Sequence, residues 1–443
     1  MKEKRIGIFG LGVTGESVFT TLDGADKVDG TDKEIICWDD SEDNRNRFQT
    51  KFEHSTLAPL SSPEWSKLDT IIISPGISKL HEVFSLAASH NILISSDVQL
   101  FIDNNPDSEL IIITGTNGKS TTTALIGHIL TCSGIDHDIG GNIGPAVLSL
   151  PKNKKYYVLE LSSFQIDLLK KFEPAISVLL NLTPDHIDRH GSFDKYCAAK
   201  ARIFDNDGLK IIGTNSDKSK ELYEKLKKTG DKKIVPISSD EGINCTSDTI
   251  TDNFFDRKSY HMETLVNLTG VHNCENIAAA FAVCRAMGLK AGEIIQHIKS
   301  FGGLKHRMQF LGNIENISFY NDSKATNTNS AASSISSLDN VLWLAGGVFK
   351  EDNLKPLGNS IKNIKKAYLF GESKLLFAEY LEGIAEYKIY DNMEKAFYSA
   401  VRDAKIEGES ANILLAPACT SLDQFKNFED RGERFIQLFE AIK

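Results

Sequence analysis

Several features that would place this chain in a special structural class are missing from its sequence. No apolar run approaches the about 18 residues that a membrane-spanning helix needs, so we expect no membrane partner. The start, residues 1–12, carries basic side chains, but glycines interrupt its apolar run, so we expect no signal peptide. The seven cysteines are odd in number and scattered, without a Cys-x-x-Cys pair. Such cysteines are typical of free thiols in a reducing compartment, and the sequence therefore predicts a cytoplasmic protein.

An excess of positive charge is also missing. The chain has 50 lysines and arginines against 60 aspartates and glutamates, which gives a formal net charge of −10. Because binding to a phosphate backbone needs a basic face, we expect no nucleic-acid partner. The sequence shows no internal repeat, coiled coil or low-complexity segment. Its 443 residues, 41% hydrophobic and 25% charged, indicate a globular protein of two or three domains.

The most informative motif is a glycine-rich turn between an apolar strand and a helix. Residues 111–123 read IIITGTNGKSTTT and run into ALIGHIL. Backbone N–H groups of such a turn and the following helix N-terminus bind phosphates, the lysine reaches the β- and γ-phosphates, and a hydroxyl binds Mg²⁺. Ile113 stands where the usual motif has its first glycine, so this loop is shorter. We expect a nucleoside triphosphate to be bound by Gly115, Thr116, Asn117, Gly118, Lys119, Ser120 and Thr121.

The chain divides into three α/β parts, at residues 1–97, 98–303 and 304–443. Short apolar strands such as TIII (70–73), VLLNL (178–182) and VLWLA (341–345) alternate with helical stretches in each part. This alternation predicts parallel sheets with helical crossovers. We therefore expect a Rossmann-like first domain, a central domain of the phosphate-loop ATPase type and a Rossmann-like third domain. The charge-rich stretch from 208 to 265 says little beyond a solvated helix and loop.

A second glycine-rich turn, Gly10-Leu-Gly12-Val-Thr-Gly15, follows the first strand. Together with Asp39 after the second strand, it predicts a diphosphate at a helix N-terminus and an acid near a ribose. A dinucleotide cofactor and a UDP-sugar both meet these requirements. Because a separate nucleotide site follows at Gly115, we favour the UDP-sugar.

Candidate catalytic residues lie near the ends of predicted strands in the central part. Glu160 ends the strand YYVLE and could complete the shell of a phosphate-bound Mg²⁺. His186 and His190 are four residues apart, a spacing that suits zinc, but a histidine near a second metal or the substrate is favoured over a zinc pair. Lys200, in YCAAKARIF, is by composition only a lysine on an alanine-rich helix. Asn273 or a neighbour could cap the helix that follows it.

Eight motifs together resemble one known family. GTNGKST, LELSSFQ, NLTPDHIDRHG, YCAAK, GVHNCEN, LKHR, NDSKATN and PACTSLDQFKNFEDRG occur in the order seen in the Mur ligases. The resemblance covers essentially the whole chain, and the last motif is similar to that of the D-glutamate-adding members. It implies a three-domain, ATP-dependent amide ligase of peptidoglycan precursor synthesis. In that reaction the carboxylate of UDP-N-acetylmuramoyl-L-alanine attacks ATP to give an acyl phosphate, D-glutamate attacks the acyl phosphate, and ADP and phosphate leave.

The resemblance also implies a role for individual residues. Lys119, Glu160, His186 and Lys200 would be catalytic, with one Mg²⁺ near Ser120 and Glu160. A second Mg²⁺ would lie near His186 and Lys200, the lysine being a carbamate formed with CO₂. The remaining ATP contacts would be Asn273, Asn276, Arg307 and Asp322. The UDP-sugar would contact Val13, Thr14, Asp39, Gly76, Asn142 and His186, and D-glutamate would contact Thr326, Lys350, Ser421, Leu422 and Phe428.

Two positions depart from the family pattern. Many relatives have an aspartate before the third-domain lysine, where this chain has Phe349. Many also carry Thr-Arg after the first-domain acid, where this chain has Asp40-Ser41. It is therefore an open question what replaces the contacts of that aspartate and of the Thr-Arg pair. The two adjacent acids, Asp39 and Asp40, also need an explanation if a diphosphate binds near them.

Other functions remain open at this point. A sister Mur-type ligase adding another amino acid, or a folylpolyglutamate synthetase-like ligase, would share most motifs. A dehydrogenase built on the first glycine-rich turn and a regulatory ATP-binding module are rivals from other classes. We expect a monomer whose third domain closes on ATP, because nucleotide contacts are assigned to two domains.

Overall fold

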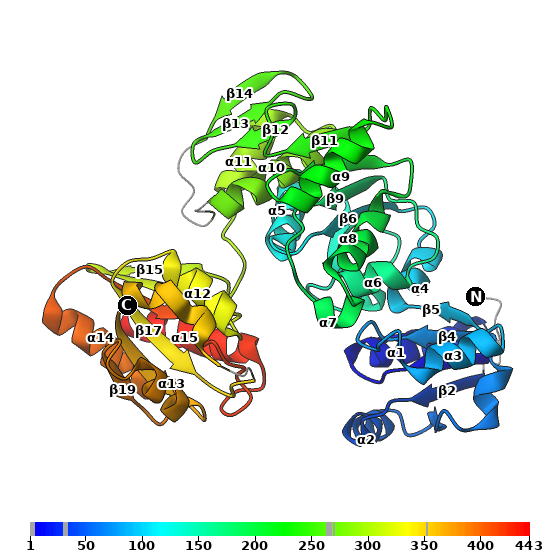
Figure 1. Cartoon of the computed structure of the whole chain (residues 1–443), viewed down its shortest axis with the longest axis horizontal. Coiled ribbons are helices and arrows are strands. Elements are labelled where there is room, and N and C mark those ends of the chain that lie inside the picture. Colours follow the sequence, from blue (N-terminus) through cyan, green and yellow to red (C-terminus); the bar gives the residue numbers. More distant parts are fainter. Residues whose placement is uncertain (1–4, 30–33, 263–267, 269–270, 351–352) are drawn as a thin grey trace. The chain divides into compact units, whose positions relative to one another are not determined.

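The computed structural model describes residues 5–29, 34–262, 268, 271–350 and 353–443 (Figure 1). The chain forms two compact units, one of residues 1–263 and 271–300 and the other of residues 264–270 and 301–443. Three sheets, one parallel and two mixed with mostly parallel strands, are flanked by helices, which confirms the expected α/β fold. The domain boundaries at 97/98 and 303/304 stay predictions. Gly270, in the GVHNCEN motif, lies outside the described residues.

The first sheet has five parallel strands in the order β3-β2-β1-β4-β5. The strands are β1 (Arg5–Phe9), β2 (Glu34–Trp38), β3 (Thr56–Leu57), β4 (Thr70–Ile73) and β5 (Leu93–Ser95). The helices are α1 (Val13–Asp29), α2 (Glu42–Lys51), the 3₁₀ helix η1 (Pro63–Lys67), α3 (Glu82–Ser89) and α4 (Asp97–Asn104). All four residues of β4 are buried, as expected for a parallel strand covered on both faces.

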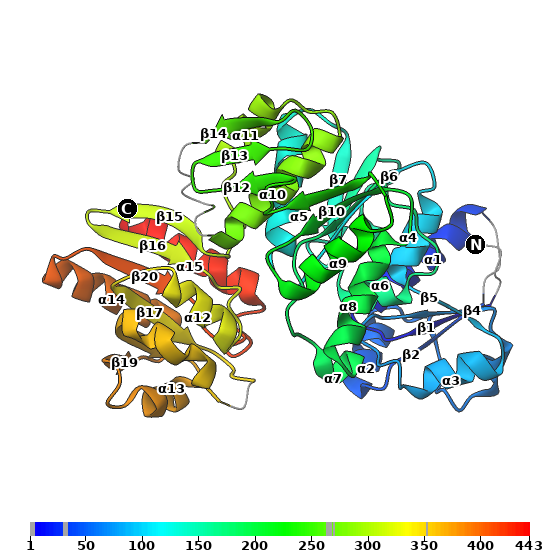
Figure 2. The same cartoon turned by 45° about the horizontal axis from the view of Figure 1, so that its top comes forward.

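The second sheet has nine strands in the order β14-β13-β12-β11-β10-β9-β6-β8-β7. The strands are β6 (Glu109–Thr114), β7 (His137–Gly141), β8 (Tyr156–Glu160), β9 (Ile176–Leu179), β10 (Leu209–Gly213), β11 (Ile234–Ile237), β12 (Ile243–Cys245), β13 (Thr249–Asp252) and β14 (Lys258–His261). Strands β6 to β12 pair in parallel, and an antiparallel meander, β12 to β14, extends one edge (Figure 2).

Nine helical segments accompany this sheet. They are α5 (Lys119–Cys132), η2 (Val147–Ser149), α6 (Ser163–Leu168), α7 (Ile187–His190), α8 (Phe193–Ala201), η3 (Arg202–Phe204), α9 (Asp217–Lys227), α10 (Val271–Ala286) and α11 (Ala291–Lys299). The predicted solvated helix of the charge-rich stretch is α9, and the five strands described around it, β10 to β14, were not predicted.

The third sheet has six strands in the order β15-β16-β20-β17-β18-β19. The strands are β15 (Gln309–Ile314), β16 (Ile317–Asn321), β17 (Val341–Gly346), β18 (Ile364–Phe370), β19 (Tyr387–Ile389) and β20 (Ala411–Leu415). The helices are α12 (Thr328–Ser336), η4 (Lys355–Asn363), α13 (Lys374–Leu381), α14 (Met393–Glu407) and α15 (Phe428–Ile442). Only β15 is antiparallel to its neighbour.

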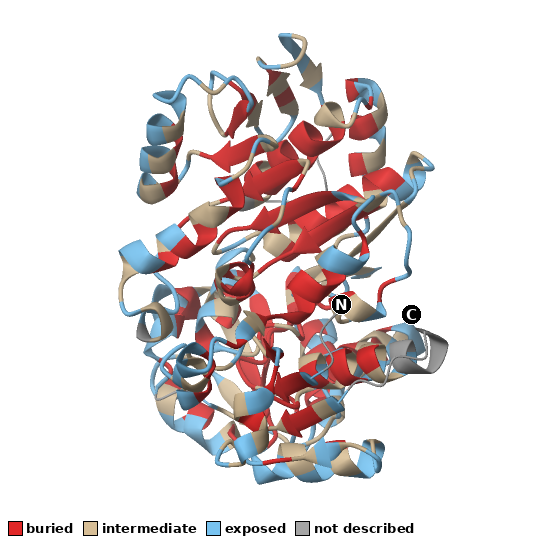
Figure 3. Cartoon of the chain, turned by 90° about the vertical axis from the view of Figure 1, so that its right-hand side faces the viewer, coloured by how far each residue is buried: buried red, intermediate tan, exposed pale blue. Residues whose placement is uncertain are grey.

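Buried residues concentrate on the strands and on the helix faces that cover them (Figure 3). The six residues of β17 are all buried, between one core that includes Trp343 and another that includes Leu342. Loops at the carboxyl ends of the parallel strands are left to carry function, because ligands of open α/β sheets bind at that edge.

Candidate active site

The phosphate loop connects β6 to α5 and has the conformation that its glycines allow. Gly118 adopts φ 83° as the N-cap of α5, and a Cβ there would collide with Asn276 Oδ1. Lys119 Nζ donates to the carbonyls of Gly115 (3.0 Å) and Thr116 (2.8 Å), so the lysine folds over its own loop. Ser120 follows in the first turn of α5 and is buried. The loop therefore presents an ammonium group and backbone N–H groups at one helix terminus, which suits a phosphate chain.

Side chains from β9 and α10 support this loop from outside. Asn181 Oδ1 accepts from the Asn117 backbone N–H at 2.9 Å, and Asn181 Nδ2 donates to Glu275 at 3.0 Å. Asn276 Oδ1 accepts from Thr122 at 3.2 Å. Burial raises the pKa of Glu275 above its ordinary value. Glu275 was not predicted as a site residue from the sequence, although it lies in the GVHNCEN motif between Asn273 and Asn276.

Glu160, at the end of β8, is 1% exposed. Its Oε1 accepts from Asn142 Nδ2 at 3.2 Å, and within the described residues its Oε2 has no hydrogen-bond partner. A buried carboxylate oxygen without a donor is expensive unless a cation or a ligand donor meets it. The pair Glu160 and Ser120 therefore fits an oxygen-preferring cation such as Mg²⁺.

Lys200, on α8, is 2% exposed. Its Nζ donates to Thr114 Oγ1 at 3.1 Å and lies 5.0 Å from the centre of the Tyr196 ring. Burial, and then the positive charge of Lys119, lower the pKa of Lys200 to about 7. The lysine that looked ordinary by composition is thus a buried amine held against the phosphate-loop strand.

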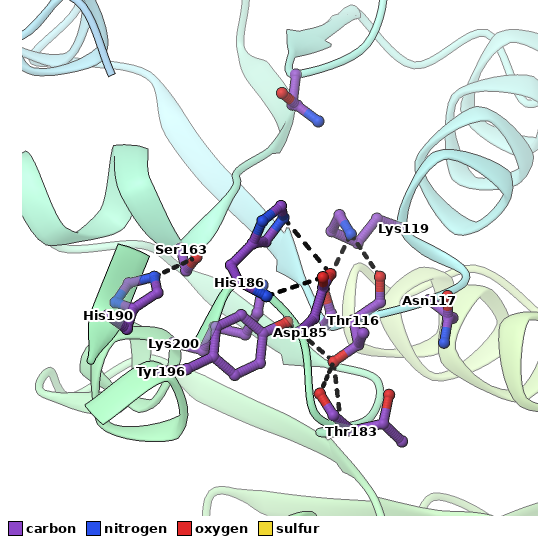
Figure 4. Close-up of polar contacts among 12 residues, drawn as sticks. Thr116, Asn117, Lys119, Ser163, Thr183, Asp185, His186, His190, Tyr196 and Lys200 are labelled. Carbon is purple, nitrogen blue, oxygen red and sulfur yellow. Dashed lines mark hydrogen bonds and ion pairs between the residues drawn. The ribbon is translucent and has the colours of Figure 1, made fainter. Parts of the chain in front are cut away.

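His186 lies between Lys119 and Lys200 in the close-up view (Figure 4). It is the N-cap of the short helix α7 and adopts φ 51°, a left-handed conformation that is uncommon outside glycine. Its Nε2 is 3.5 Å from Asp185 Oδ2. His190 instead bonds Ser163 Oγ at 2.9 Å and stacks on Phe164. Among the described residues no group of three or more His, Cys, Asp or Glu side chains that could hold a metal ion is found.

One cavity of about 600 Å³ joins these groups to the loops of the first sheet. Phosphate-site residues Lys119, His186 and Lys200 line one part of it. The remaining part is formed by loops that follow β1, β2 and β4, together with the segment after β7. All six residues assigned to the UDP-sugar line this cavity: Val13, Thr14, Asp39, Gly76, Asn142 and His186.

The two adjacent acids after β2 have separate roles. Asp39 is buried and accepts from the backbone N–H groups of Leu11 (2.6 Å) and Ser41 (2.8 Å), so it holds the glycine-rich turn. Asp40 is 2.8 Å from His81 Nε2. Because His81 Nδ1 accepts a backbone N–H as the N-cap of α3, its Nε2 carries the proton and donates to Asp40. The second acid is thereby tied to a neighbouring helix.

Arg189, on α7, fastens the loop after β4 to the phosphate site. Its guanidinium donates to the carbonyls of Pro75 and Gly76, each at 3.0 Å, and to that of Ile77. It also lies over the Phe164 ring, 4.9 Å from its centre. The loop that carries Gly76 and the loop that carries His186 are therefore joined by one side chain, which the sequence analysis did not single out.

The residues assigned to D-glutamate all lie in the second unit, four on loops after β16, β17 and β20 and the fifth, Phe428, at the start of α15. Those strands are neighbours in the sheet, and the loops bond to each other: Val348 pairs with Thr420 in both directions, and Ala418 donates to Ala325. Ser421 is buried and Leu422 is 61% exposed. The assigned residues at this sheet edge are Thr326, Lys350, Ser421, Leu422 and Phe428.

Arg431 fixes these loops through hydrogen bonds made by its buried guanidinium group. It is completely buried and donates to Ser323 Oγ (2.9 Å) and to the carbonyls of Ser323 (2.8 Å) and Cys419 (3.0 Å). Phe349, which replaces the family's aspartate, packs edge-on against Phe377 with ring centres 5.8 Å apart. An aromatic contact with α13 thus stands where relatives carry a charge.

The third-part residues assigned to ATP also lie in the second unit. Asp322 is buried, accepts from Ser334, and has its pKa raised to about 6 by burial. Arg307 is exposed, next to His306, which is buried. In the first unit, Asn273 accepts from Asn276 Nδ2 at 3.0 Å. It lies inside α10, which begins at Val271, so Asn273 does not cap that helix.

Two negative observations apply to the parts of the chain that the structure describes. No helix there is both long and apolar enough to cross a membrane. The seven cysteines, all in described segments, form no disulfide bond.

The sequence matches two family models. Residues 113–284 match the Mur ligase middle domain, and residues 306–419 match the Mur ligase glutamate ligase domain. A UDP-N-acetylmuramoylalanine–D-glutamate ligase of Rickettsia bellii is 46% identical, over 100% of this chain and 98% of the relative. A protein of the same name from Agrobacterium fabrum is 39% identical, over 99% of this chain and 96% of the relative.

Solved structures with the same fold are more distant in sequence. UDP-N-acetylmuramate–alanine ligase of Thermotoga maritima gives a TM-score of 0.58 at 16% identity, covering 99% of this chain and 100% of that one. The MurF protein of Acinetobacter baumannii gives 0.55 at 18% identity, covering 79% of this chain and 82% of that one. At these identities the likeness concerns the three-domain fold alone.

Proposed function

The chain belongs to the Mur ligases, ATP-dependent amide ligases of peptidoglycan synthesis, and from this we propose that it joins D-glutamate to UDP-N-acetylmuramoyl-L-alanine. ATP is consumed, and ADP and phosphate are released. The relatives that match over the full chain carry the name of this reaction, and the family's domain models cover its central and carboxyl-terminal parts.

One observation carries the proposal. A single cavity is lined both by the residues assigned to the UDP-sugar and by Lys119, His186 and Lys200. A sugar nucleotide bound along it would place one end at Asp39 and the other beside the phosphate loop. That arrangement suits a reaction in which the substrate's own carboxylate attacks ATP, because positioning two anions is the main task of such a catalyst.

The first step needs neutralisation of charge. The substrate carboxylate oxygen forms a bond to the γ-phosphorus while the bond to the β–γ bridging oxygen breaks, so ADP leaves. Lys119 and the N–H groups at the start of α5 face the phosphates, and Glu160 and Ser120 would hold Mg²⁺. Bound Mg²⁺ would supply positive charge against the phosphate oxygens. His186 and Lys200 line the same cavity and would hold a second ion, the lysine as its carbamate.

The environment of Lys200 supports carbamate formation. CO₂ reacts with a neutral amine, forming an N–C bond and releasing a proton. Burial and the neighbouring Lys119 lower the pKa of Lys200 to about 7, so the neutral amine is abundant at neutral pH. The product is an anion beside a cation-rich site, which removes the repulsion between two lysines.

In the second step the D-glutamate amine attacks the acyl phosphate carbonyl and phosphate leaves. Lys350 and Ser421, on bonded loops of the second unit, would hold the amino acid by its carboxylates. Arg307 and Asp322 would contact ATP from the third domain, and Asn273 and Asn276 would face adenine. These roles belong to the proposal.

The decisive experiment measures ADP formation from UDP-N-acetylmuramoyl-L-alanine with D-glutamate against a panel of other amino acids. We expect the rate of ADP release with D-glutamate to be far above the rate with L-glutamate, L-alanine or a diamino acid. Preference for another amino acid would assign the chain to a sister ligase, and glutamate addition to a folate would assign it to the folylpolyglutamate type. ATP binding without substrate-dependent ADP would favour a regulatory module, and an NAD-dependent absorbance change would favour a dehydrogenase.

We further propose a cytoplasmic monomer. Size-exclusion chromatography with light scattering tests the monomer, for which a mass near 49.0 kDa is expected.

A further inference from the structure

The cavity is lined by a buried acid, Asp97, that no part of the reaction described above uses. Asp97 is the first residue of α4, directly after β5, and it lines the cavity. It is 4% exposed, so its carboxylate is shielded from bulk water. The strand-end rule applied to β5 could have pointed to it from the sequence.

The hydrogen bonding of Asp97 is incomplete. Backbone N–H groups at the start of α4 face the carboxylate, but in the described part of the chain no donor meets Oδ1. Burial raises the pKa of Asp97 to about 6. A buried carboxylate oxygen without a hydrogen-bond donor carries a desolvation penalty. Natural proteins retain such groups where a ligand supplies the missing donor.

Hydrogen bonds and apolar contacts anchor helix α4 and so fix the backbone position of Asp97. Ser96 caps the helix by accepting from the Gln99 backbone N–H at 3.2 Å. The Gln99 side chain in turn accepts from the Lys170 backbone N–H at 2.9 Å and donates to the Lys171 carbonyl at 3.0 Å. The apolar face of α4 is split between two cores, with Val98 and Phe101 in one and Leu100 in the other.

Electrostatics restricts what the carboxylate can contact. Phosphate or carboxylate groups of a ligand would repel it, and they have better partners: the start of α1 for the diphosphate, and Lys119 with the bound Mg²⁺ for the reacting end. What remains between those two ends of a sugar nucleotide is the neutral sugar, whose hydroxyl and amide groups are donors.

We propose that Asp97 is a sugar-binding residue, whose Oδ1 accepts a hydrogen bond from an O–H or N–H group of the sugar in the sugar nucleotide. This inference rests on the proposed function, since it assumes that a sugar nucleotide occupies the cavity. It assigns Asp97 to binding and selecting the substrate and gives it no part in phosphoryl transfer.

The test compares Asp97→Asn with Asp103→Asn, the same change at an exposed position of the same helix. Calorimetry measures binding of UDP-N-acetylmuramoyl-L-alanine and of UDP, which lacks the sugar. Asp97→Asn should weaken binding of the sugar nucleotide about 10-fold or more, because a hydrogen bond to a charged acceptor is lost. Binding of UDP should not change, and Asp103→Asn should bind both ligands as the wild type does.

Thermal unfolding separates binding from a structural role. Without ligand, Asp97→Asn should be as stable as the wild type or more stable, since a buried charge is removed, while its stabilisation by the sugar nucleotide should be smaller. Wild-type affinity of Asp97→Asn for the sugar nucleotide, or an equal loss for UDP, would overturn the inference. So would a less stable ligand-free variant with an unchanged ligand response. If the wild-type protein bound no sugar nucleotide, the proposed function itself would fall.

Discussion

At the scale of single residues, the candidate site consists of ionisable groups buried without full compensation. Lys200, Glu160 and Asp97 are 2%, 1% and 4% exposed, and the two acids each keep an oxygen without a partner in the described residues. Ordinary cores avoid such groups because their desolvation opposes folding. Their presence in one place is the residue-level sign of a site that is completed by charged ligands.

Replacing Lys200 by methionine should abolish ligation and stabilise the fold. The folded pKa of Lys200 is about 7, against 10.5 for the free group, so between these values the unfolded chain binds the extra proton. In CO₂-free buffer the wild type should therefore gain stability as the pH rises from about 7 towards 10, and the full penalty should persist below pH 7. Lys200→Met should lack that gain.

The measurement is urea unfolding at pH 7 and pH 9.5, combined with ADP release. Lys195→Met, on the same helix but exposed, serves as the control and should change neither quantity. An active Lys200→Met variant, or one with the wild-type pH dependence, would show that burial does not govern this lysine.

A second change at the same position tests the carbamate. Lys200→Ala should lose ligation and regain part of it when a short-chain carboxylic acid is added, because the acid would supply the missing anionic oxygens. Activity is followed as ADP release against acid concentration. Full activity of the variant without any acid would remove Lys200 from the catalytic residues.

Lys350→Ala should raise the KM for D-glutamate at least about 10-fold, as expected when a charge-assisted hydrogen bond is lost, and leave the KM for ATP nearly unchanged. Lys355→Ala, at another exposed lysine of the same unit, is the matched control. Steady-state kinetics with each substrate varied in turn gives both constants, and equal rises in the two would refute the assignment of Lys350.

At the scale of elements, the phosphate loop depends on α10. Asn276 occupies the space next to Gly118, and Glu275 supports Asn181, which in turn holds the loop backbone at Asn117. The conformation of the phosphate loop therefore depends on α5, on α10 and on the segment after β9. A change in any of these should alter the affinity for the nucleotide.

Gly118→Ala tests this dependence. The added Cβ collides with Asn276, so the loop must move, and the KM for ATP should rise about 10-fold or more, with lower stability as well. Gly134→Ala introduces the same left-handed strain, φ 66°, where nothing lies within 4 Å. It should cost about 1–2 kcal/mol of stability and leave the KM for ATP unchanged. A similar KM in both variants would contradict the role of the α10 contact.

Element prediction from the sequence succeeded for several strands that are apolar throughout and failed in the charge-rich stretch, where even the mostly buried strands β10 and β11 were missed. TIII, YYVLE and VLWLA correspond to β4, β8 and β17, because strands covered on both faces need continuous apolar runs. Strands β12 to β14 have half-exposed, polar sequences and pair within a meander, a long-range effect that local pattern does not carry. A cap at Asn273 or a neighbour was expected, whereas α10 already begins at Val271.

Some residues of the candidate site could also be predicted from local sequence, and others could not. The phosphate-loop residues followed from local chemistry, and Glu160 followed from its position at a strand end. A histidine near a metal or the substrate was expected from the residues at 186 and 190, whereas Lys200 gained its role only through the family resemblance, because its burial and its bond to Thr114 of β6 come from tertiary structure. Arg189 and Arg431 act through contacts more than 70 residues away in the chain, which are not visible in a single sequence. Asp97 follows a strand end and could have been found by that rule, although its burial could not.

At the scale of the whole molecule, a protein of net charge −10 is proposed to bind three anionic ligands. Attraction must therefore come from a few local cations: Lys119, which lines the cavity, and the Mg²⁺ ions that the site would hold. Because the proposed ATP contacts are divided between the two compact units, we expect small-angle scattering to change when a non-hydrolysable ATP analogue and the sugar nucleotide are added together. Identical scattering curves would count against closure of the third domain.

The attachment of Arg189 to three consecutive carbonyls has a consequence for how this sequence can diverge. Those bonds set the spacing between residues 75–77 and the start of α7 to within the reach of one side chain. An insertion or deletion in either segment would carry the carbonyls out of register with the guanidinium and separate the two halves of the cavity. Length changes should therefore be tolerated in outer loops, such as the one after α9, and be selected against in these two segments together.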